Sequence, residues 1–507
     1  MRLRDDKTTD YRPLTTDYRP LLKTAVIFHR LGPYHFARLR AIGRLLPVTA
    51  IETSGRDGTY AWDLVAGSDG FERVTLFDRA DAQQLPARTV ASRMGSALDK
   101  IRPRVVVVPG WADPAALGAL QWSVQNRVPA VIMSESTAWD AARGAWREAM
   151  KRRVVGLGSA ALVGGRPHKE YMGKLGMPAE RVFLGYDAVD GEYFASGAQR
   201  ARSQAAAAPN SQLPAPSSPP SDLRSQVSDL MSPISAFQDV SVSAFQNAPY
   251  FLASARFVEK KNLTRLIEAY ALYRKKSEVR SQKSDLRPLS SNLWSLVLLG
   301  DGPLKSDLCR LISDLGLQDS VLLPGFKQYP DLPMYYGLAS AFIHVSTTEQ
   351  WGLVVNEAMA SGLPVLVSNR CGCAPDLVKD GVNGFTFDPY NIEEMANTMM
   401  QVWSMERRAA ARGQMTDDGG RKTENENTSP RPSPRRGEGG LFQCSTLNAQ
   451  PSTTLAEMGA ASRAIISEWG PERFAAGLKA AVEKALEVGP KQAGVMDRLV
   501  LRALLAR

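Results

Sequence analysis

The sequence predicts an α/β protein built from two doubly wound domains, and three observations carry that prediction. Short apolar runs alternate with helical patterns between residues 24 and 194, as in parallel sheets covered by helices. The same alternation resumes near Tyr250. Between the two regions the composition changes abruptly to Ser, Ala, Pro and Gln. At ~150 residues per domain, a chain of 507 residues allows about three such units.

We divide the chain into seven segments on this basis. Polar, Pro-rich stretches are expected to be disordered, because they bury too little apolar area to offset their ordering entropy. One of them, at the N-terminus, repeats T-T-D-Y-R-P-L in tandem. The segments are a disordered extension (1–22), a first domain (23–196), a disordered linker (197–247), a second domain (248–405), a low-complexity insertion (406–454), C-terminal helices that pack back on the first domain (455–487) and a basic tail (488–507).

The first domain begins with the strand A-V-I-F after Thr24. A helix follows, with apolar residues at helical spacing (Phe36, Leu39, Ile42, Leu45 and Leu46). The four valines at 105–108 are typical of a buried parallel strand. Ligands bind at the carboxyl ends of such strands, so the loops that begin at His29, Pro109 and Ser134 should form the ligand edge. Further strands are expected at 47–51, 74–77, 130–133 and 160–163.

The second domain shows the same alternation. A helical pattern runs from Leu263 to Tyr273, and the C-terminal helices carry Ile465, Trp469 and Phe474 as apolar markers. Its strands are expected at 251–254, 296–300, 321–324, 341–345, 364–367 and 385–387.

One stretch of this domain, residues 340–368, predicts a strand, a polar loop, a helix and a second strand. Gly352 in the loop allows a ligand to approach the backbone closely. A helix that begins there, at about Leu353, points unpaired N–H groups and its positive dipole end at the ligand, which favours an anion. Glu349 and Glu357 bracket the start of this helix, and ionised carboxylates accept hydrogen bonds from hydroxyl groups. A ligand with both phosphate and hydroxyls is a sugar nucleotide.

Other residues fall at the same sheet edge. Arg256 and Lys261 follow the first strand of the second domain, where they would suit a diphosphate or would simply be solvated charges. Gly302 lies in a G-D-G-P turn after the next strand. Phe326 follows the third strand, and its ring would hold a nucleobase or serve packing alone.

Composition narrows the class of protein. The net charge of +10 would suit nucleic acid, an anionic membrane surface or phosphorylated small molecules, but no basic run carries interleaved aromatics. No apolar run reaches the ~18 residues of a membrane span, and the N-terminus has no apolar signal region. The four cysteines fit neither a disulfide framework nor a zinc site. We therefore expect a cytoplasmic protein without a metal site.

Several ordered motifs in residues 250–389 resemble the C-terminal half of a glycosyltransferase family 4 (group 1) enzyme of the GT-B fold, in which two Rossmann-like domains face each other across a cleft. They are A-R-F-V-E-K-K-N-L, L-L-G-D-G-P, L-P-G-F, E-Q-W-G-L-V-V-N-E-A-M-A-S-G-L-P-V and D-G-V-N-G-F. In the N-terminal half, Y-D-A-V-D-G-E-Y-F at 186–194 resembles the segment before the family's domain crossover.

The resemblance implies a role for each matching residue. Arg256 and Lys261 would hold the donor diphosphate, Glu349 would meet the donor sugar, and Glu357 would bind the ribose hydroxyls. The backbone at Trp351, Gly352, Leu353 and Val354 would contact sugar or phosphate, and Gly32 in the first domain would approach the diphosphate. Where the family often has two glycines and a Glu, this chain has C-G-C-A-P-D, so Cys371, Cys373 and Asp376 inherit no role.

The residue of the first domain that faces the reacting carbon is not fixed by the resemblance. Glu135, at the end of a predicted buried strand, is the best candidate, followed by His35 and His29. Aromatic residues of the first-domain loops, Tyr34, Tyr60, Trp62 and Trp111, would contact an acceptor or serve packing.

The function implied is retaining, metal-independent transfer of a sugar from a nucleoside diphosphate sugar to an acceptor hydroxyl, with no further cofactor. The acceptor would be a carbohydrate or a lipid-linked molecule of cell-surface polysaccharide or glycolipid synthesis, met at the inner face of an anionic membrane. A sugar-nucleotide epimerase of similar fold and a non-catalytic sugar-nucleotide-binding protein are the alternatives. Nucleic-acid binding is a third, and it predicts affinity that falls steeply with salt.

Overall fold

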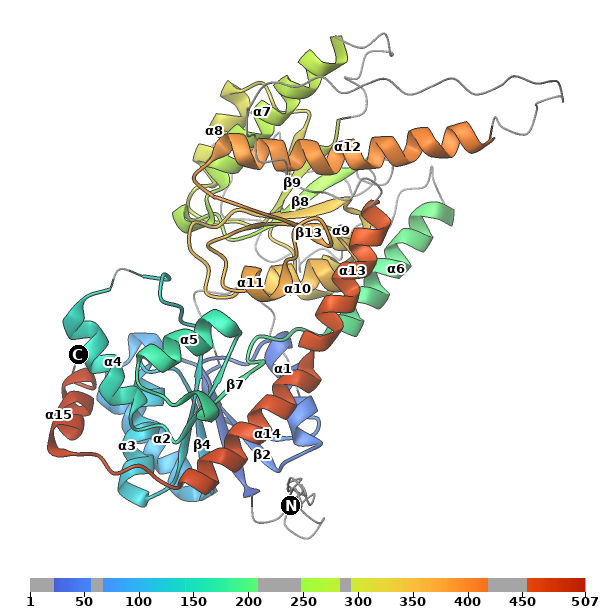
Figure 1. The fold of residues 1–507 in the computed structure, drawn as a ribbon. Helices are drawn as coiled ribbons and strands as arrows, with labels where there is room; N and C mark the ends of the chain where they lie inside the picture. Colours follow the sequence, from blue (N-terminus) through green and yellow to red (C-terminus); the bar gives the residue numbers. More distant parts are fainter. Residues whose placement is uncertain are drawn as a thin grey trace, which may run out of the picture.

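The computed structural model describes residues 22–55, 67–141, 143–207, 248–282, 293–417 and 454–506. In the first domain, seven parallel strands form one sheet in the order β3-β2-β1-β4-β5-β6-β7 (Figure 1). The central strands are buried on both faces, which explains the run of valines in β4. The strands are β1 (Thr24–Phe28), β2 (Val48–Ser54), β3 (Glu72–Phe77), β4 (Val105–Pro109), β5 (Ala130–Ser134), β6 (Ala160–Val163) and β7 (Val182–Leu184).

The second domain holds a parallel sheet of six strands in the order β10-β9-β8-β11-β12-β13. They are β8 (Tyr250–Ser254), β9 (Ser295–Leu299), β10 (Val321–Gly325), β11 (Ala341–His344), β12 (Val365–Ser368) and β13 (Gly384–Phe387). In both sheets the first strand lies in the middle and the order reverses there, which is the doubly wound arrangement.

Helices cover both faces of each sheet (Figure 1). The first domain contains α1 (Pro33–Gly43), α2 (Ala87–Ile101), α3 (Pro114–Asn126), α4 (Ala145–Val155) and α5 (Arg166–Lys174). The second contains α7 (Leu263–Gln282), α8 (Lys305–Asp314), α9 (Leu332–Leu338), α10 (Leu353–Ala360), α11 (Ala374–Leu377) and α12 (Ile392–Asp417). Short 3-10 turns lie at 82–84, 179–181, 259–261, 329–331 and 467–469.

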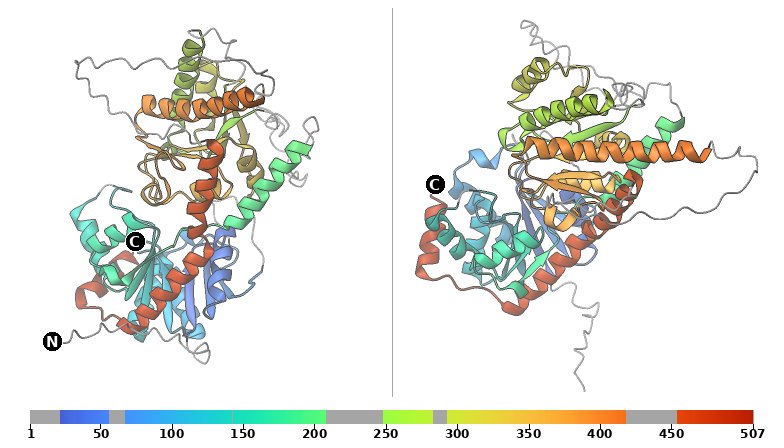
Figure 2. Two further views of the ribbon diagram at one scale, coloured as in Figure 1. Left: turned by 45° about the vertical axis from the view of Figure 1, so that its right-hand side comes forward. Right: turned by 45° about the horizontal axis from the view of Figure 1, so that its top comes forward.

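The C-terminal helices return the chain to the first domain (Figure 2). Helix α13 (Leu455–Ile466) packs on α10, and after Gly470 helix α14 (Pro471–Val488) lies against α1 and strands β4 to β7. Phe474 and Leu478 of α14 are fully buried in the same core as β1. The chain thus crosses between the domains twice, once before α6 (Gly191–Ala207) and once before α14.

Two expected boundaries are wrong. The disordered linker was expected from residue 197, but α6 continues to Ala207, because its alanines favour a helix and Ala198 and Ala201 are buried beside α9. The low-complexity insertion was expected from residue 406, but α12 continues to Asp417. The rest of the three segments expected to be disordered lies almost entirely outside the described residues.

The basic tail expected at 488–507 contains helix α15 (Val495–Leu504). Leu501 of this helix and Leu505 just after it are buried in the core that includes α2 and α3. Among the described residues, no helix is long and apolar enough to cross a membrane.

Candidate active site

The loop between β11 and α10 is the centre of the candidate site. Helix α10 begins at Leu353, as the sequence predicted, and Gly352 at its N-cap has a φ of 101°. A Cβ at this position would lie 2.8 Å from Sγ of Cys371, so both the backbone conformation and the space require glycine. In the part of the chain that the structure describes, the N–H groups of 352–354 donate to no protein acceptor. The start of α10 is therefore open to an anion.

Glu349 lies in a buried cluster of donors beside this helix. Its Oε2 accepts from the ammonium of Lys261 and from Oγ of Ser346 (3.2 Å), and it lies 3.3 Å from Nε2 of His344. Burial alone would raise the pKa of Glu349, but Lys261 and His344 outweigh it and hold the pKa well below its usual range. Glu349 is thus ionised, and Lys261 is fixed next to it.

Glu357, one turn inside α10, has surroundings that shift its pKa in the opposite direction. Its side chain is only 1% exposed. One carboxylate oxygen accepts from the hydroxyl of Tyr336 (2.7 Å) in its own domain, and the other accepts from the hydroxyl of Tyr34 in α1 of the first domain. Burial raises the pKa of Glu357 to about 7, although both tyrosine hydroxyls oppose the shift.

The remaining donor-side candidates differ in how accessible they are. Arg256 is exposed on the loop after β8, and Phe326 is 39% exposed after β10. Gly302, with a φ of 155°, lies in the turn after β9. The indole of Trp351 is buried, donates to Oδ1 of Asn356 (2.9 Å) and packs on Trp469, so only its backbone could meet a ligand. Leu353 and Val354 lie in the first turn of α10.

In the first domain, the backbone of the loop before α1 donates a hydrogen bond to a side chain of that helix. The N–H of Gly32 donates to Nδ1 of His35 (3.0 Å), and burial lowers the pKa of His35 to about 3, so its ring is neutral. His29 lies 3.8 Å from Asp113 and 3.9 Å from Asp81. His35 therefore supports the loop, and neither histidine reaches Glu349 or Glu357 in the contacts described.

Glu135 follows β5 and is brought close to the second domain. The Glu349 carboxylate is near enough to raise its pKa, after the larger effects of burial and of Arg38, which opposes burial. Asp187, fully buried in the segment after β7, lies beside Glu135; burial and then Glu135 raise the pKa of Asp187 well above its usual range. The half-buried Glu135 and the buried Asp187 thus form a carboxyl pair at the domain boundary, with the buried Arg38 next to it.

Contacts between the domains surround these residues. Asp376 pairs with Arg166 (2.7 Å) and also accepts from its backbone N–H (2.9 Å) at the start of α5. His168 donates to the carbonyl of Gln350 (2.8 Å), and the indole of Trp139 donates to the carbonyl of Arg370 (3.4 Å). Asp376, which inherited no role from the resemblance, thus joins the domains next to the site.

The C-x-C sequence is also part of the site. Sγ of Cys371 donates to the carbonyl of Trp351 (2.8 Å) and lies 3.5 Å from Sγ of Cys373, and both cysteines are buried. The described residues contain no group of three or more His, Cys, Asp or Glu side chains arranged to hold a metal ion.

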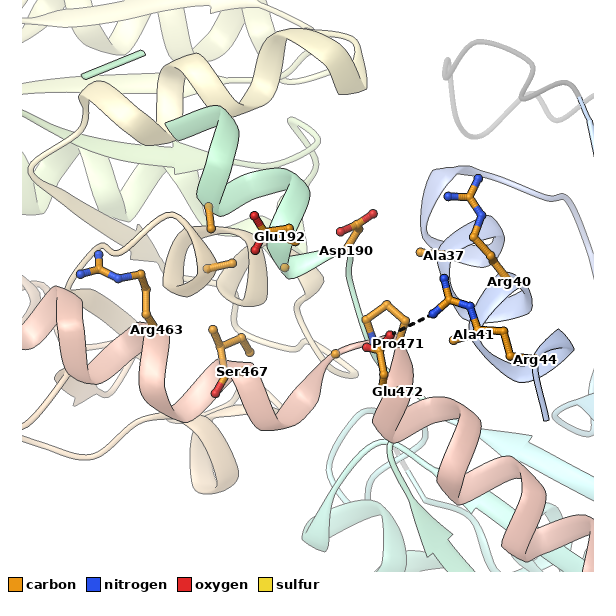
Figure 3. A pocket seen from close by; sticks show the side chains of 15 residues that line it. Ala37, Arg40, Ala41, Arg44, Asp190, Glu192, Arg463, Ser467, Pro471 and Glu472 are labelled. Carbon is orange, nitrogen blue, oxygen red and sulfur yellow. Dashed lines mark ion pairs between the residues drawn. The ribbon is translucent and has the colours of Figure 1, made fainter. Parts of the chain in front are cut away.

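A separate cavity of about 550 Å³ lies at the two chain crossings, away from the residues above (Figure 3). Arg40 of α1, Arg44 just after it and Asp190 line this cavity, and Arg44 pairs with Glu472 at 3.9 Å. None of the predicted site residues lines this cavity.

Several residues of the site were missed by the sequence analysis. Tyr336 and His344 sit inside apolar segments, and Asp187 sits inside the motif at 186–194, which indicated no role for it. The importance of all three depends on contacts made only after folding. Tyr34 was expected to contact an acceptor or to serve packing, and its hydroxyl reaches Glu357 in the other domain. Trp111 packs against Tyr171 in the first domain, while Tyr60 and Trp62 lie outside the described residues.

Comparison with known proteins agrees with the resemblance seen in the motifs. Residues 236–417 match the family model of glycosyl transferases group 1. The lipopolysaccharide core biosynthesis glycosyltransferase LpsE of Rhizobium meliloti is 32% identical over 173 residues, 34% of this chain and 45% of the relative. A GDP-mannose-dependent phosphatidylinositol monomannoside mannosyltransferase of Mycolicibacterium smegmatis is 30% identical over 172 residues, 32% of this chain and 41% of the relative. Neither alignment spans half of the relative's own length.

Solved structures extend the likeness to the whole fold. HepE of Anabaena, crystallised with UDP and glucose, superposes with a TM-score of 0.55 and 15% identity, over 90% of this chain and 98% of its own. The expected GT-B fold is therefore confirmed.

Proposed function

We propose, from the premise that residues 236–417 belong to the group 1 glycosyltransferases, that the whole chain transfers a sugar from a nucleoside diphosphate sugar to an acceptor hydroxyl. The observation that carries this proposal is the start of α10, where free N–H groups, the Lys261 ammonium and the ionised Glu349 lie together. An anion beside a hydroxylated group is the ligand that this combination suits.

In this mechanism the bond between the anomeric carbon and the diphosphate oxygen breaks as the acceptor oxygen attacks from the same face. The acceptor's proton passes to the leaving diphosphate, and the anomeric configuration is retained. Arg256, Lys261 and the N–H groups of α10 stabilise the growing negative charge on the diphosphate, in place of a divalent ion. Two of the three ammonium hydrogens of Lys261 remain available while one is shared with Glu349.

The two glutamates of the second domain bind different parts of the donor. Glu349 accepts from hydroxyls of the sugar, and Glu357 accepts from the ribose. Glu135 faces the reacting carbon from the first domain, and its partner Asp187 keeps a proton on the pair. The acceptor, a carbohydrate or lipid-linked hydroxyl of cell-surface polysaccharide or glycolipid synthesis, approaches from the first domain at the inner face of the membrane.

The experiment is a thermal-shift screen of the full chain against uridine, guanosine and adenosine diphosphate sugars, because a ligand that binds only the folded state raises the melting temperature. The donor that shifts it is then incubated, isotopically labelled, with and without a mixture of candidate acceptors. Transfer with retained anomeric configuration and in the presence of EDTA is expected. An epimerised sugar, or binding without transfer or hydrolysis, would contradict the proposal.

A further inference from the structure

Both carboxylate oxygens of Glu357 accept a hydrogen bond from the protein itself. Tyr336 donates to one oxygen from within the second domain, and Tyr34 donates to the other from α1 of the first domain. Since the Glu357 side chain is 1% exposed, a hydroxyl of a ligand can reach it only when one of the groups that cover it leaves.

The two tyrosines differ in how readily they could leave. Tyr336 is fully buried in α9, inside the same rigid core as α10. Tyr34 is half-buried in the first turn of α1, and its ring meets Tyr329 edge-on at a centroid distance of 5.6 Å. It therefore moves with the first domain whenever the domains separate, whereas Tyr336 stays with Glu357.

We propose that Tyr34 is a gate: its hydroxyl occupies the place on Glu357 that a ribose hydroxyl takes, and donor binding exchanges one for the other. The inference rests on the proposed function, in which Glu357 binds the ribose of a nucleoside diphosphate.

The exchange conserves the chemistry of the carboxylate. A buried carboxylate that loses a donor is left with an unsatisfied charge, which is costly. When a ribose hydroxyl replaces the Tyr34 hydroxyl, Glu357 keeps the same number of hydrogen-bond donors. Before the donor binds, the hydrogen bond from Tyr34 satisfies the carboxylate and joins the two domains. The consequence is competition, because the hydrogen bond from Tyr34 must be broken before the ribose can bind.

Two variants test the gate as a matched pair. Tyr34→Phe and Tyr336→Phe each remove one hydroxyl from Glu357, but only the first removes it from the opposite domain. Binding of UDP, GDP and ADP is measured by calorimetry on the full chain at pH 8.5, above the Glu357 pKa of about 7. Tyr34→Phe should bind about fivefold more tightly than the unmodified protein, the effect of one competing hydrogen bond. Tyr336→Phe should not bind more tightly.

The 2′,3′-dideoxy forms of the same nucleotides identify the group that takes over. Because these nucleotides lack the ribose hydroxyls, Tyr34→Phe should bind them no more tightly than the unmodified protein does. A third measurement needs no ligand: small-angle scattering should show a larger radius of gyration for Tyr34→Phe than for Tyr336→Phe, since only the former removes a hydrogen bond between the domains.

The outcomes separate the two proposals. Equal or weaker binding, by Tyr34→Phe, of the nucleotide that the unmodified protein binds overturns the gate and leaves the transferase proposal standing. An advantage that persists with dideoxy nucleotides also overturns the exchange. If none of the three nucleotides binds the unmodified protein or the variant, no ligand makes the exchange, and both proposals fail.

Discussion

At the scale of single residues, the site shifts the pKa values of two glutamates, eight positions apart in the sequence, in opposite directions. Glu349 is ionised because Lys261 and His344 surround it. Glu357 is buried beside hydroxyl groups alone, and its pKa rises to about 7. The spacing alone does not reveal this difference, because it arises from residues of β11, α9 and α1 that fold around the helix.

This difference predicts opposite dependences of stability on pH. The raised pKa of Glu357 means that the folded state binds the proton more tightly than the unfolded state, so its stabilisation is lost as pH rises from about 4.5 to 7. The lowered pKa of Glu349 gives stabilisation that is present above about 4.5 and lost only on further acidification.

Unfolding free energies between pH 5 and 8 check the prediction. Relative to the unmodified protein, Glu357→Gln should gain up to about 3 kcal/mol across this range, from a shift of 4.5 to about 7 at ~1.4 kcal/mol per unit. Glu349→Gln should be less stable by a nearly constant amount. Parallel curves for the two variants would contradict the assignment.

Lys261→Ala should lower turnover by about 100-fold or more, since one lost donor to a developing oxyanion costs ~3 kcal/mol. Lys276→Ala is the control, because Lys276 pairs with Glu393 elsewhere in the domain. Initial rates at saturating donor, with melting curves to exclude unfolding, provide the measurement. Near-normal turnover in Lys261→Ala would contradict the proposal that Lys261 stabilises the leaving diphosphate.

Much of the donor side could be predicted at this scale, because its residues lie in continuous motifs. Gly352 and the start of α10 at Leu353 follow from local backbone rules. The environment of Glu357 could not, since Tyr34 lies 323 positions away and its contact depends on how two domains meet.

At the scale of elements, α14 is the clearest case of a helix that belongs to a distant part of the chain. A Cβ at Gly477 would lie 2.3 Å from the carbonyl of Leu184, so the helix lies directly on β7. Its apolar periodicity predicted a buried helix, but α15 was not predicted, because its apolar residues lie in a short segment that was interpreted as a basic tail.

Leu478→Ala should therefore destabilise the first domain, although Leu478 lies beyond the second in sequence. Its side chain is fully buried, and such truncations cost about 2–5 kcal/mol. Glu487→Ala at an exposed position of the same helix should change stability by less than about 1 kcal/mol. Denaturant unfolding followed by tryptophan fluorescence distinguishes the two, and equal effects would show that α14 does not anchor the domain.

At the scale of the whole molecule, Asp376 and Arg166 form one of the polar contacts between the domains near the site. Asp376→Asn should weaken the contact with Arg166 and α5. Arg166 is 65% exposed, so the effect should stay below about 1 kcal/mol, a rise of up to about fivefold in open molecules.

Small-angle scattering at low salt should detect this as a larger radius of gyration. The difference from the unmodified protein should shrink in 1 M salt, which screens exposed charges. Asp380→Asn serves as the control, because Asp380 bonds Thr386 within the second domain. An unchanged radius at low salt would mean that Asp376 does not contribute to closure.

The return of α14 to the first sheet also affects the order in which the protein can fold during synthesis. Roughly 260 residues separate the end of α6 from α14, and at ~5–20 residues per second their translation takes about 13 to 50 s. Throughout that interval one face of the first sheet, including Val26, Phe28 and Leu162, has α1 but lacks α14, the second helix that packs in the same core. The second domain is therefore completed first, and the N-terminal domain is the last to close.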